Sequence, residues 1–127
     1  MMLYLDTSVM VKLSVEESMS SDVVEVVKEA EAVATSLIAY AEARAAFARA
    51  RREARLSVLA YRALVKKFIE GWSRFVVVEV TDRVVKHAGD LAAHRALRGF
   101  DALHLESALN LRDRLATPVT FLAFDRS

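Results

Sequence analysis

Four short apolar runs along the chain each predict a buried strand. They consist of branched, aromatic and small apolar residues, a composition that favours strands when polar residues bound the run. The runs are residues 3–5, 32–35, 75–80 and 119–124. Asp6, Thr7 and Ser8 follow the first run, and Ser36 follows the second. Because such side-chain oxygens cap helices, the first two strands are expected to lead directly into helices.

Between these runs, apolar residues recur at the three- and four-residue spacing of a helix face. The segment from Ser57 to Ser73, for example, has one apolar stripe among charged residues, which is typical of an amphipathic helix. Two predicted helices begin after Asp6 and after Ser20. Four others span about 37–52, 57–73, 82–97 and 101–114. Strands that alternate with helices indicate an α/β sandwich around a mostly parallel sheet of about four strands.

The length and composition of the chain fit one globular domain. With 127 residues, of which 54% are hydrophobic, the chain is too short for a second core and too apolar for a disordered protein. We therefore expect a single domain over residues 1–127. The lack of cysteine excludes disulfides and thiolate metal sites and favours the cytoplasm. No apolar run approaches the roughly 18 residues that span a bilayer, so no membrane association is expected.

Basic residues are concentrated in one part of the chain. The formal net charge is only +1, but residues 44–67 carry eight Lys and Arg side chains against a single acidic one, Glu53. Two predicted helices lie in this segment, so it is expected to form a basic helical hairpin. On its own, such a run of charge is most often solvated surface.

Acidic residues stand near the points where the strands of a parallel sheet would end. Asp6 and Asp125 directly follow the first and last predicted strands. Glu42 lies in the second turn of the helix after the second strand, and Asp101 lies in the first turn of a later helix. Ligands of open parallel sheets bind beyond the carboxyl ends of the strands. These four side chains are therefore expected to meet in one pocket.

Four carboxylates in one pocket repel one another. Two of them about 5 Å apart at an effective dielectric constant of 20 cost roughly 3 kcal/mol, so the group would partly protonate unless a cation were bound. Mg²⁺ and Mn²⁺ take oxygen ligands and are usually completed by waters and substrate phosphates. The cluster therefore indicates a divalent cation and phosphate-ester chemistry, in which two ions roughly 4 Å apart activate a water and stabilise the leaving oxygen.

Three segments of the chain resemble PIN-domain ribonucleases. They are Tyr4-Leu5-Asp6-Thr7-Ser8 at the first strand, Leu97-Arg98-Gly99-Phe100-Asp101-Ala102-Leu103-His104-Leu105 around Asp101, and Thr120-Phe121-Leu122-Ala123-Phe124-Asp125 at the last strand, together with the helix that bears Glu42. The resemblance spans residues 3 to 125. It is greatest to the VapC-type toxins of prokaryotic toxin–antitoxin pairs.

This resemblance implies a PIN-like three-layer sandwich and a metal-dependent endoribonuclease that cuts single-stranded RNA. It implies Mg²⁺ or Mn²⁺ as the cofactor, with Ser8 as a supporting residue and the metal held by the catalytic residues Asp6, Glu42, Asp101 and Asp125. The implied partners are RNA, a cognate antitoxin protein and a second copy of the chain in a homodimer. Beside such a site, the basic hairpin is expected to hold RNA phosphates or to lie where the antitoxin docks. The candidate RNA-binding residues are Arg44, Arg49, Arg51, Arg52 and Arg55.

Other interpretations of these residues remain open. Asp6 suits a helix N-cap as well as a metal ligand. Glu42 has a salt bridge to Arg44 or Arg49 as its alternative role. His104 lies on the same helix face as an expected metal ligand, but a lone histidine among apolar neighbours is more often packed in a core. We therefore leave His104 outside the catalytic set.

The chain as a whole also leaves alternatives. A PIN-like module that holds RNA or protein without cutting is the main alternative function, although the complete set of four acidic residues favours the enzyme. Family members usually continue past the last acidic residue into another helix and a short strand, whereas this sequence stops at Ser127. Either the sheet lacks that edge strand or the chain is truncated.

Overall fold

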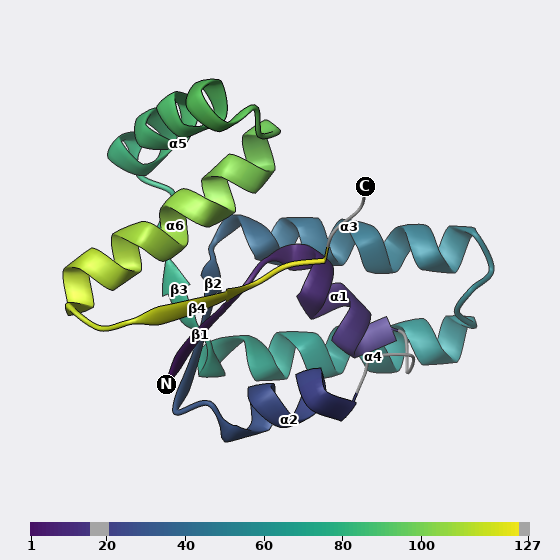
Figure 1. Cartoon of the computed structure of the whole chain (residues 1–127). Helices are drawn as coiled ribbons and strands as arrows, with labels where there is room; N and C mark the ends of the chain where they lie inside the picture. The colour runs from purple at the N-terminus through teal and green to yellow at the C-terminus, as the bar shows by residue number, and fades with distance from the viewer. Residues whose placement is uncertain (16–20, 125–127) are drawn as a thin grey trace.

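The computed structural model describes residues 1–15 and 21–124, and Figure 1 shows how its elements are arranged. In chain order the elements are β1 (Met2–Leu5), α1 (Thr7–Val15), α2 (Ser21–Glu29), β2 (Ala32–Ser36), α3 (Ile38–Arg52), α4 (Val58–Gly71), the short 3-10 helix η1 (Trp72–Arg74), β3 (Val76–Val78), α5 (Asp82–Arg95), α6 (Gly99–Leu115) and β4 (Val119–Leu122). None of the helices in these two ranges is both long and apolar enough to cross a membrane.

The four strands form one sheet in the order β3-β2-β1-β4, and all neighbouring strands are parallel. β1 lies inside the sheet, where Tyr4 is opposite Ala34 of β2 and Phe121 of β4. The predicted α/β fold with a parallel sheet of about four strands is therefore confirmed. Because the strands run in the same direction, their carboxyl ends share one edge, and Asp6 follows β1 at this edge.

Two of the predicted strands are shorter in the structure. β3 ends at Val78 rather than at Val80, because its neighbour β2 ends at the paired residue Ser36. β4 ends at Leu122, which pairs with Leu5, the last residue of β1. In both cases the neighbouring strand gives way to a helix, so the residues beyond the pair have no strand to bond.

Helices cover both faces of the sheet (Figure 1). On one face, Tyr4 of β1 packs against Leu111 of α6. Side chains alternate along a strand, and the next residue, Leu5, faces a cavity that Met10 of α1 and Phe68 of α4 also line. The three-layer sandwich is therefore present, with α6 on one side and α1, α3 and α4 on the other.

Helices α3 and α4 form the predicted hairpin, and aromatic rings join them. The ring centroids of Phe47 and Phe68 lie 5.2 Å apart, and those of Tyr40 and Phe68 lie 5.5 Å apart. Phe47 is fully buried. Most of the basic side chains of the hairpin are exposed. The apolar stripes therefore set the packing of the two helices and leave the charges at the surface.

The pair of helices α5 and α6 stands beside the sheet edge that carries Asp6 (Figure 1). α6 begins at Gly99, two residues before the predicted start at Asp101. The two helices pack through a cluster of small and branched side chains, namely Val84, Ala88, Ala102 and Leu103. This packing holds the first turns of α6, which carry Asp101 and His104.

We expect Phe47→Ala to lower the free energy of unfolding by about 3–5 kcal/mol, because it removes a fully buried ring and leaves a cavity beside Phe68. The control Leu59→Ala changes a residue that is 77% exposed on α4, and should stay within about 0.5 kcal/mol of the parent. Urea unfolding followed by circular dichroism measures both. Equal effects of the two substitutions would contradict the packing of α3 on α4.

Candidate active site

Asp6 is held at the carboxyl edge of the sheet, between β1 and α1. Its backbone N–H donates to the carbonyl oxygen of Leu122 at 3.1 Å. Its carboxylate oxygen Oδ1 accepts hydrogen bonds from Ser8 Oγ at 2.6 Å and from Val9 N at 3.1 Å. Asp6 is only 9% exposed. Asp6 therefore caps α1, and Ser8, the predicted supporting residue, donates to its carboxylate.

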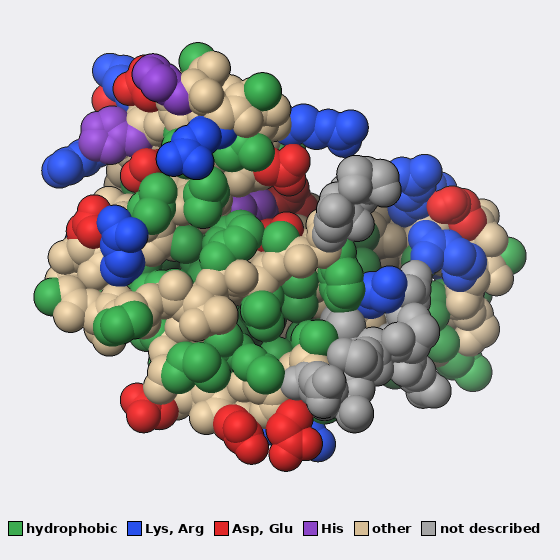
Figure 2. Space-filling model, in the orientation of Figure 1, with side chains coloured by type: hydrophobic (Ala, Val, Ile, Leu, Met, Phe, Trp, Pro, Cys, Tyr) green, Lys and Arg blue, Asp and Glu red, His purple; other side chains and the backbone are tan. Residues whose placement is uncertain are grey.

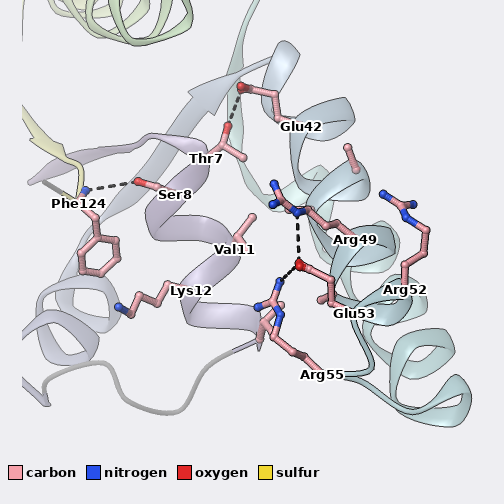
Figure 3. Close-up of a pocket in the computed structure, with 14 residues that line it drawn as sticks. Thr7, Ser8, Val11, Lys12, Glu42, Arg49, Arg52, Glu53, Arg55 and Phe124 are labelled. Carbon is pink, nitrogen blue, oxygen red and sulfur yellow. Dashed lines mark hydrogen bonds and ion pairs between the residues drawn. The ribbon is translucent and has the colours of Figure 1, made fainter. Parts of the chain in front are cut away.

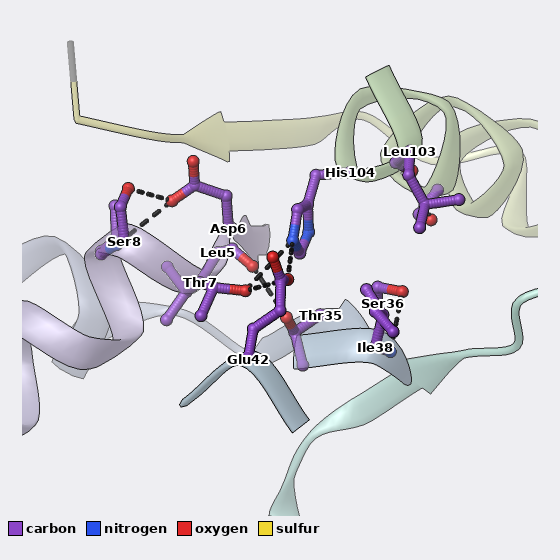
Figure 4. Close-up of polar contacts among 12 residues, drawn as sticks. Leu5, Asp6, Thr7, Ser8, Thr35, Ser36, Ile38, Glu42, Leu103 and His104 are labelled. Atoms are coloured by element: carbon purple, nitrogen blue, oxygen red, sulfur yellow. Dashed lines mark hydrogen bonds and ion pairs between the residues drawn. The ribbon is translucent and has the colours of Figure 1, made fainter. Parts of the chain in front are cut away.

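Capping does not exclude metal binding by the same carboxylate. Among the described residues, both hydrogen bonds to the Asp6 side chain end on Oδ1, so Oδ2 is the oxygen that can meet a cation (Figure 4). Ser8 Oγ also accepts a hydrogen bond from Phe124 N at 3.3 Å. This bond holds Phe124, the residue before Asp125, close to Ser8 and Asp6. Asp125 itself lies outside the described residues.

Glu42 reaches the site from the second turn of α3. Its Oε1 accepts a hydrogen bond from Thr7 Oγ1 at 2.6 Å, and His104 Nε2 lies 2.9 Å from the same oxygen. The Glu42 side chain is 26% exposed. Arg49, which the sequence offered as a salt-bridge partner, pairs with Glu53 of its own helix at 3.2 Å. The side chains that hold Glu42 therefore include two that come from α1 and α6.

His104 joins this group from the buried side. It is 3% exposed, as expected for a core histidine, but both ring nitrogens make polar contacts. Nδ1 lies 2.8 Å from the hydroxyl oxygen of Tyr4. Nε2 lies 2.9 Å from Glu42 Oε1 and 3.1 Å from Thr7 Oγ1 (Figure 4). The burial of His104 was predicted from the sequence, whereas its contact with a candidate metal ligand was not.

Tyr4 is protonated, and the carboxylate of Glu42 determines which nitrogen of His104 donates. Burial raises the pKa of Tyr4 well above its ordinary value of 10.0, hydrogen bonding with Ser107 opposes this rise, and the charges of Asp6 and Glu42 add to it. Tyr4 therefore stays neutral. Because the carboxylate of Glu42 only accepts, we assign the ring proton of His104 to Nε2, and Nδ1 then accepts from the hydroxyl of Tyr4.

The four predicted metal ligands do not all come together in the described structure. Thr7, the residue after Asp6, donates to Glu42 at 2.6 Å, so Asp6 and Glu42 lie near the same point of the sheet edge (Figure 4). Asp101 lies in the first turn of α6 and is exposed. Within residues 1–15 and 21–124, no group of three or more acidic, histidine or cysteine side chains is close enough to hold one ion.

The chemistry of the site fits a hard divalent cation. The side chains available are carboxylates, and the chain contains no cysteine. Mg²⁺ and similar ions prefer oxygen ligands and are commonly bound through one or two carboxylates, with waters and substrate phosphates completing the shell. Asp6, whose orientation is set by Ser8 and Val9, and Glu42, whose orientation is set by Thr7 and His104, would supply those carboxylates.

A groove between α1 and α3 leads away from these carboxylates. It has a volume of about 740 Å³ and its lining includes Thr7, Ser8 and Glu42 together with Lys12, Arg49, Arg52 and Arg55 (Figure 3). On the surface, acidic side chains and a histidine occupy a hollow beside α5 and α6, and Lys and Arg side chains gather toward the end of α3 (Figure 2). Of the five arginines predicted to bind RNA, Arg44 and Arg51 are not among the residues that line this groove.

Sequence reasoning missed Thr7 as well as His104. Thr7 stands between two residues that were singled out, and His104 lies one turn after Asp101 on α6. These positions in the sequence were the available signals. They do not reveal that either residue contacts Glu42, because Glu42 is 35 residues from Thr7 and 62 from His104 along the chain.

Comparisons with known proteins agree with this fold. A profile of the PIN domain family matches residues 3–118, which defines the class of the chain as a PIN domain. Ribonuclease VapC45 and Ribonuclease VapC49, from two strains of Mycobacterium tuberculosis, are each 38% identical to the chain over 112 residues, which make up 88% of this chain and 78% of the relative. The chain therefore belongs to the VapC ribonucleases of the PIN domain family, as its motifs predicted.

Two solved structures share the fold. A toxin–antitoxin complex from Klebsiella pneumoniae matches with a TM-score of 0.62 at 17% sequence identity, over 87% of this chain and 80% of that chain. VapBC2 from Rickettsia felis, bound to a DNA fragment from its promoter, matches with a TM-score of 0.60 at 15% identity, over 98% of this chain and 100% of that chain. At such identities the likeness establishes the fold alone.

The raised pKa of Tyr4 predicts how stability depends on pH. In the unfolded chain Tyr4 ionises near pH 10, whereas in the folded chain it keeps its proton to higher pH. The unfolded state therefore binds fewer protons above pH 10, and stability falls as pH rises. We expect the unfolding free energy of the parent, relative to Tyr4→Phe, to drop by roughly 1 kcal/mol between pH 8 and pH 10.5. Urea unfolding at both pH values tests this, and a constant difference would contradict it.

Proposed function

We propose that the chain cleaves single-stranded RNA with the help of Mg²⁺ or Mn²⁺, as the toxin of a pair whose other member is a small antitoxin protein. The observation that carries the proposal is a pair of oriented carboxylates, Asp6 and Glu42, beside a groove that arginine side chains line. Carboxylates suit a cation that meets the scissile phosphate, and arginines suit the neighbouring phosphates of the same strand.

The proposed metal ligands are Asp6 and Glu42, with Asp101 and Asp125 as further ligands. A bound Mg²⁺ or Mn²⁺ supplies Lewis-acid stabilisation of the phosphate and lowers the pKa of a water. The protein's own task is to hold its carboxylates in place, through Ser8 for Asp6 and through Thr7 for Glu42. Ser8 Oγ already donates to Asp6 and accepts from the backbone amide of Phe124, which supports an orienting role rather than a nucleophilic one.

The groove between α1 and α3 is the proposed path of the RNA. Glu53 pairs with Arg49 at 3.2 Å and with Arg55 at 3.6 Å, so it holds two cationic side chains at one end of the groove (Figure 3). Phosphate contacts position a strand and carry no base information. We therefore assign these arginines to affinity and not to the rate of bond cleavage.

The proposed partners follow from several separate observations. One solved protein of the same fold is a toxin–antitoxin complex, which supports an antitoxin for this chain. A homodimer stays a prediction, based on the family resemblance and on the apolar composition, with a mean hydropathy of +0.24. Location in the cytoplasm stays a prediction from the lack of cysteine.

A second candidate function is an RNA- or protein-binding module that does not cut. It is favoured by one observation, the exposed position of Asp101 away from a three-ligand cluster within the described residues. The two functions differ in one measurement, since only the enzyme produces cleaved RNA when Mg²⁺ or Mn²⁺ is added.

Each of four substitutions is expected to reduce RNA cleavage by about 100-fold or more, because each replaces a negative oxygen ligand with a neutral amide. The substitutions are Asp6→Asn, Glu42→Gln, Asp101→Asn and Asp125→Asn. Single-turnover cleavage of a labelled single strand with Mn²⁺, with and without EDTA, provides the measurement. The control is Asp113→Asn, an exposed acid that pairs with Arg112 elsewhere on α6, and it should keep the parent activity. Full activity in EDTA, or in any two of the four variants, would contradict the mechanism.

The double variant Arg52→Glu with Arg55→Glu is expected to weaken RNA binding about equally across sequences and to flatten its salt dependence, because fewer counterions are released. The matched control, Arg62→Glu with Lys66→Glu, makes the same charge change at exposed positions of α4 that do not line the groove. Fluorescence anisotropy with several single strands at two salt concentrations measures affinity. Cleavage at saturating RNA should stay within about threefold of the parent. Equal losses in the two double variants would show that net charge, and not the groove, holds the RNA.

A further inference from the structure

A buried chain of polar contacts runs from the middle of the sheet to Glu42. It starts at the hydroxyl of Tyr4 in β1, passes through the ring of His104 in α6 and ends at Oε1 of Glu42 in α3. Tyr4 is fully buried and His104 is 3% exposed. Buried ring nitrogens generally need polar partners, and one of the two partners of His104 is the candidate metal ligand Glu42.

The carboxylate of Glu42 determines the direction of these hydrogen bonds. A carboxylate only accepts, so we assign the ring proton of His104 to Nε2, which lies 2.9 Å from Glu42 Oε1, and Nδ1 then accepts from the hydroxyl of Tyr4. Thr7 Oγ1 donates to the same oxygen at 2.6 Å. These two contacts, from α1 and α6, fix the orientation of Oε1 of Glu42.

We propose that His104 is a positioning residue that holds Glu42 in the orientation required for metal binding. The inference rests on the proposed function, in which Glu42 is a metal ligand. Glu42 has several rotatable bonds and is 26% exposed, so an unheld side chain would sample many orientations. Ordering it in advance lowers the entropy that ion binding must remove. The buried Tyr4 hydroxyl in turn contacts Nδ1 of His104 at 2.8 Å and supports the ring from behind, as outer partners of metal ligands commonly do.

Two substitutions at His104 separate positioning from packing. His104→Gln places an amide nitrogen near the former Nε2 and keeps a donor for Glu42. His104→Asn places its amide near the former Nδ1, keeps a partner for Tyr4 and loses the donor to Glu42. Both remove the ring and leave a similar gap in the core. They differ mainly in the one contact that the proposal concerns.

The measurement is the affinity of the full chain for Mn²⁺ without RNA, by isothermal titration calorimetry. We expect His104→Asn to weaken Mn²⁺ binding by about 10-fold or more, and His104→Gln to stay within about threefold of the parent. Urea unfolding without metal records the packing loss of each variant separately. Equal Mn²⁺ affinities for the Asn and Gln variants, whether at the parent level or equally weakened, would overturn the proposal.

A measurement on the unaltered protein avoids any folding defect of the variants. Nitrogen NMR of ¹⁵N-histidine-labelled parent protein should show His104 with its proton on Nε2, and this resonance should shift when Mg²⁺ is added. A proton on Nδ1, or an Nε2 signal that Mg²⁺ leaves unchanged, would overturn the proposal. Asp6→Asn serves as the reference for the proposed function. If Asp6→Asn bound Mn²⁺ as tightly as the parent, the metal site itself would be refuted. If Asp6→Asn lost Mn²⁺ binding while His104→Asn and His104→Gln had equal Mn²⁺ affinities, only the role of His104 would be refuted.

Discussion

The hydrogen bond between Tyr4 and His104 joins the central strand to helix α6, and the candidate site depends on it. Both side chains are almost completely buried, where an unpaired polar group costs about 1–3 kcal/mol. A packing of the strand and the helix that separated these two groups is therefore disfavoured. The observed packing sets the rotation of α6, directs Nε2 of His104 toward Glu42 and leaves Asp101 one turn nearer the start of the helix. Core packing and site geometry are thus parts of the same arrangement.

Asp6 likewise combines a structural role with a proposed role in the site, at the edge of the sheet. The amide of Val9 and the hydroxyl of Ser8 use one oxygen of its carboxylate, so the start of α1 is capped whether or not a cation meets the other oxygen. Ser8 also accepts from Phe124 N, and the amide of Asp6 donates to Leu122. The segment that leads toward Asp125 is therefore tied to the same residues that orient Asp6, because β4 lies directly beside β1 in the sheet.

Acidic and basic side chains lie at different parts of the groove. Its acidic end lies at the carboxyl edge of the sheet, and its arginine-rich part lies where α3 ends. A net charge of +1 conceals this arrangement, since it sums all 18 basic and 17 acidic side chains of the chain. A polyanion meeting the protein would be attracted by the arginines and repelled by the carboxylates unless a cation neutralised them. Metal binding and RNA binding are therefore coupled by simple electrostatics in the proposed function.

The sequence by itself determined the alternation of strands and helices, the basic hairpin and the placement of Asp6 at the sheet edge. Apolar periodicity, capping residues and the shared direction of parallel strands are enough for these features. Only the tertiary structure decided that β3 stops at Val78, because the length of a strand depends on the strand beside it. It also decided that Thr7 and His104 hold Glu42. These residues come from three different helices, and which side chains meet across such distances in sequence depends on how the helices pack on the sheet, which no local pattern contains.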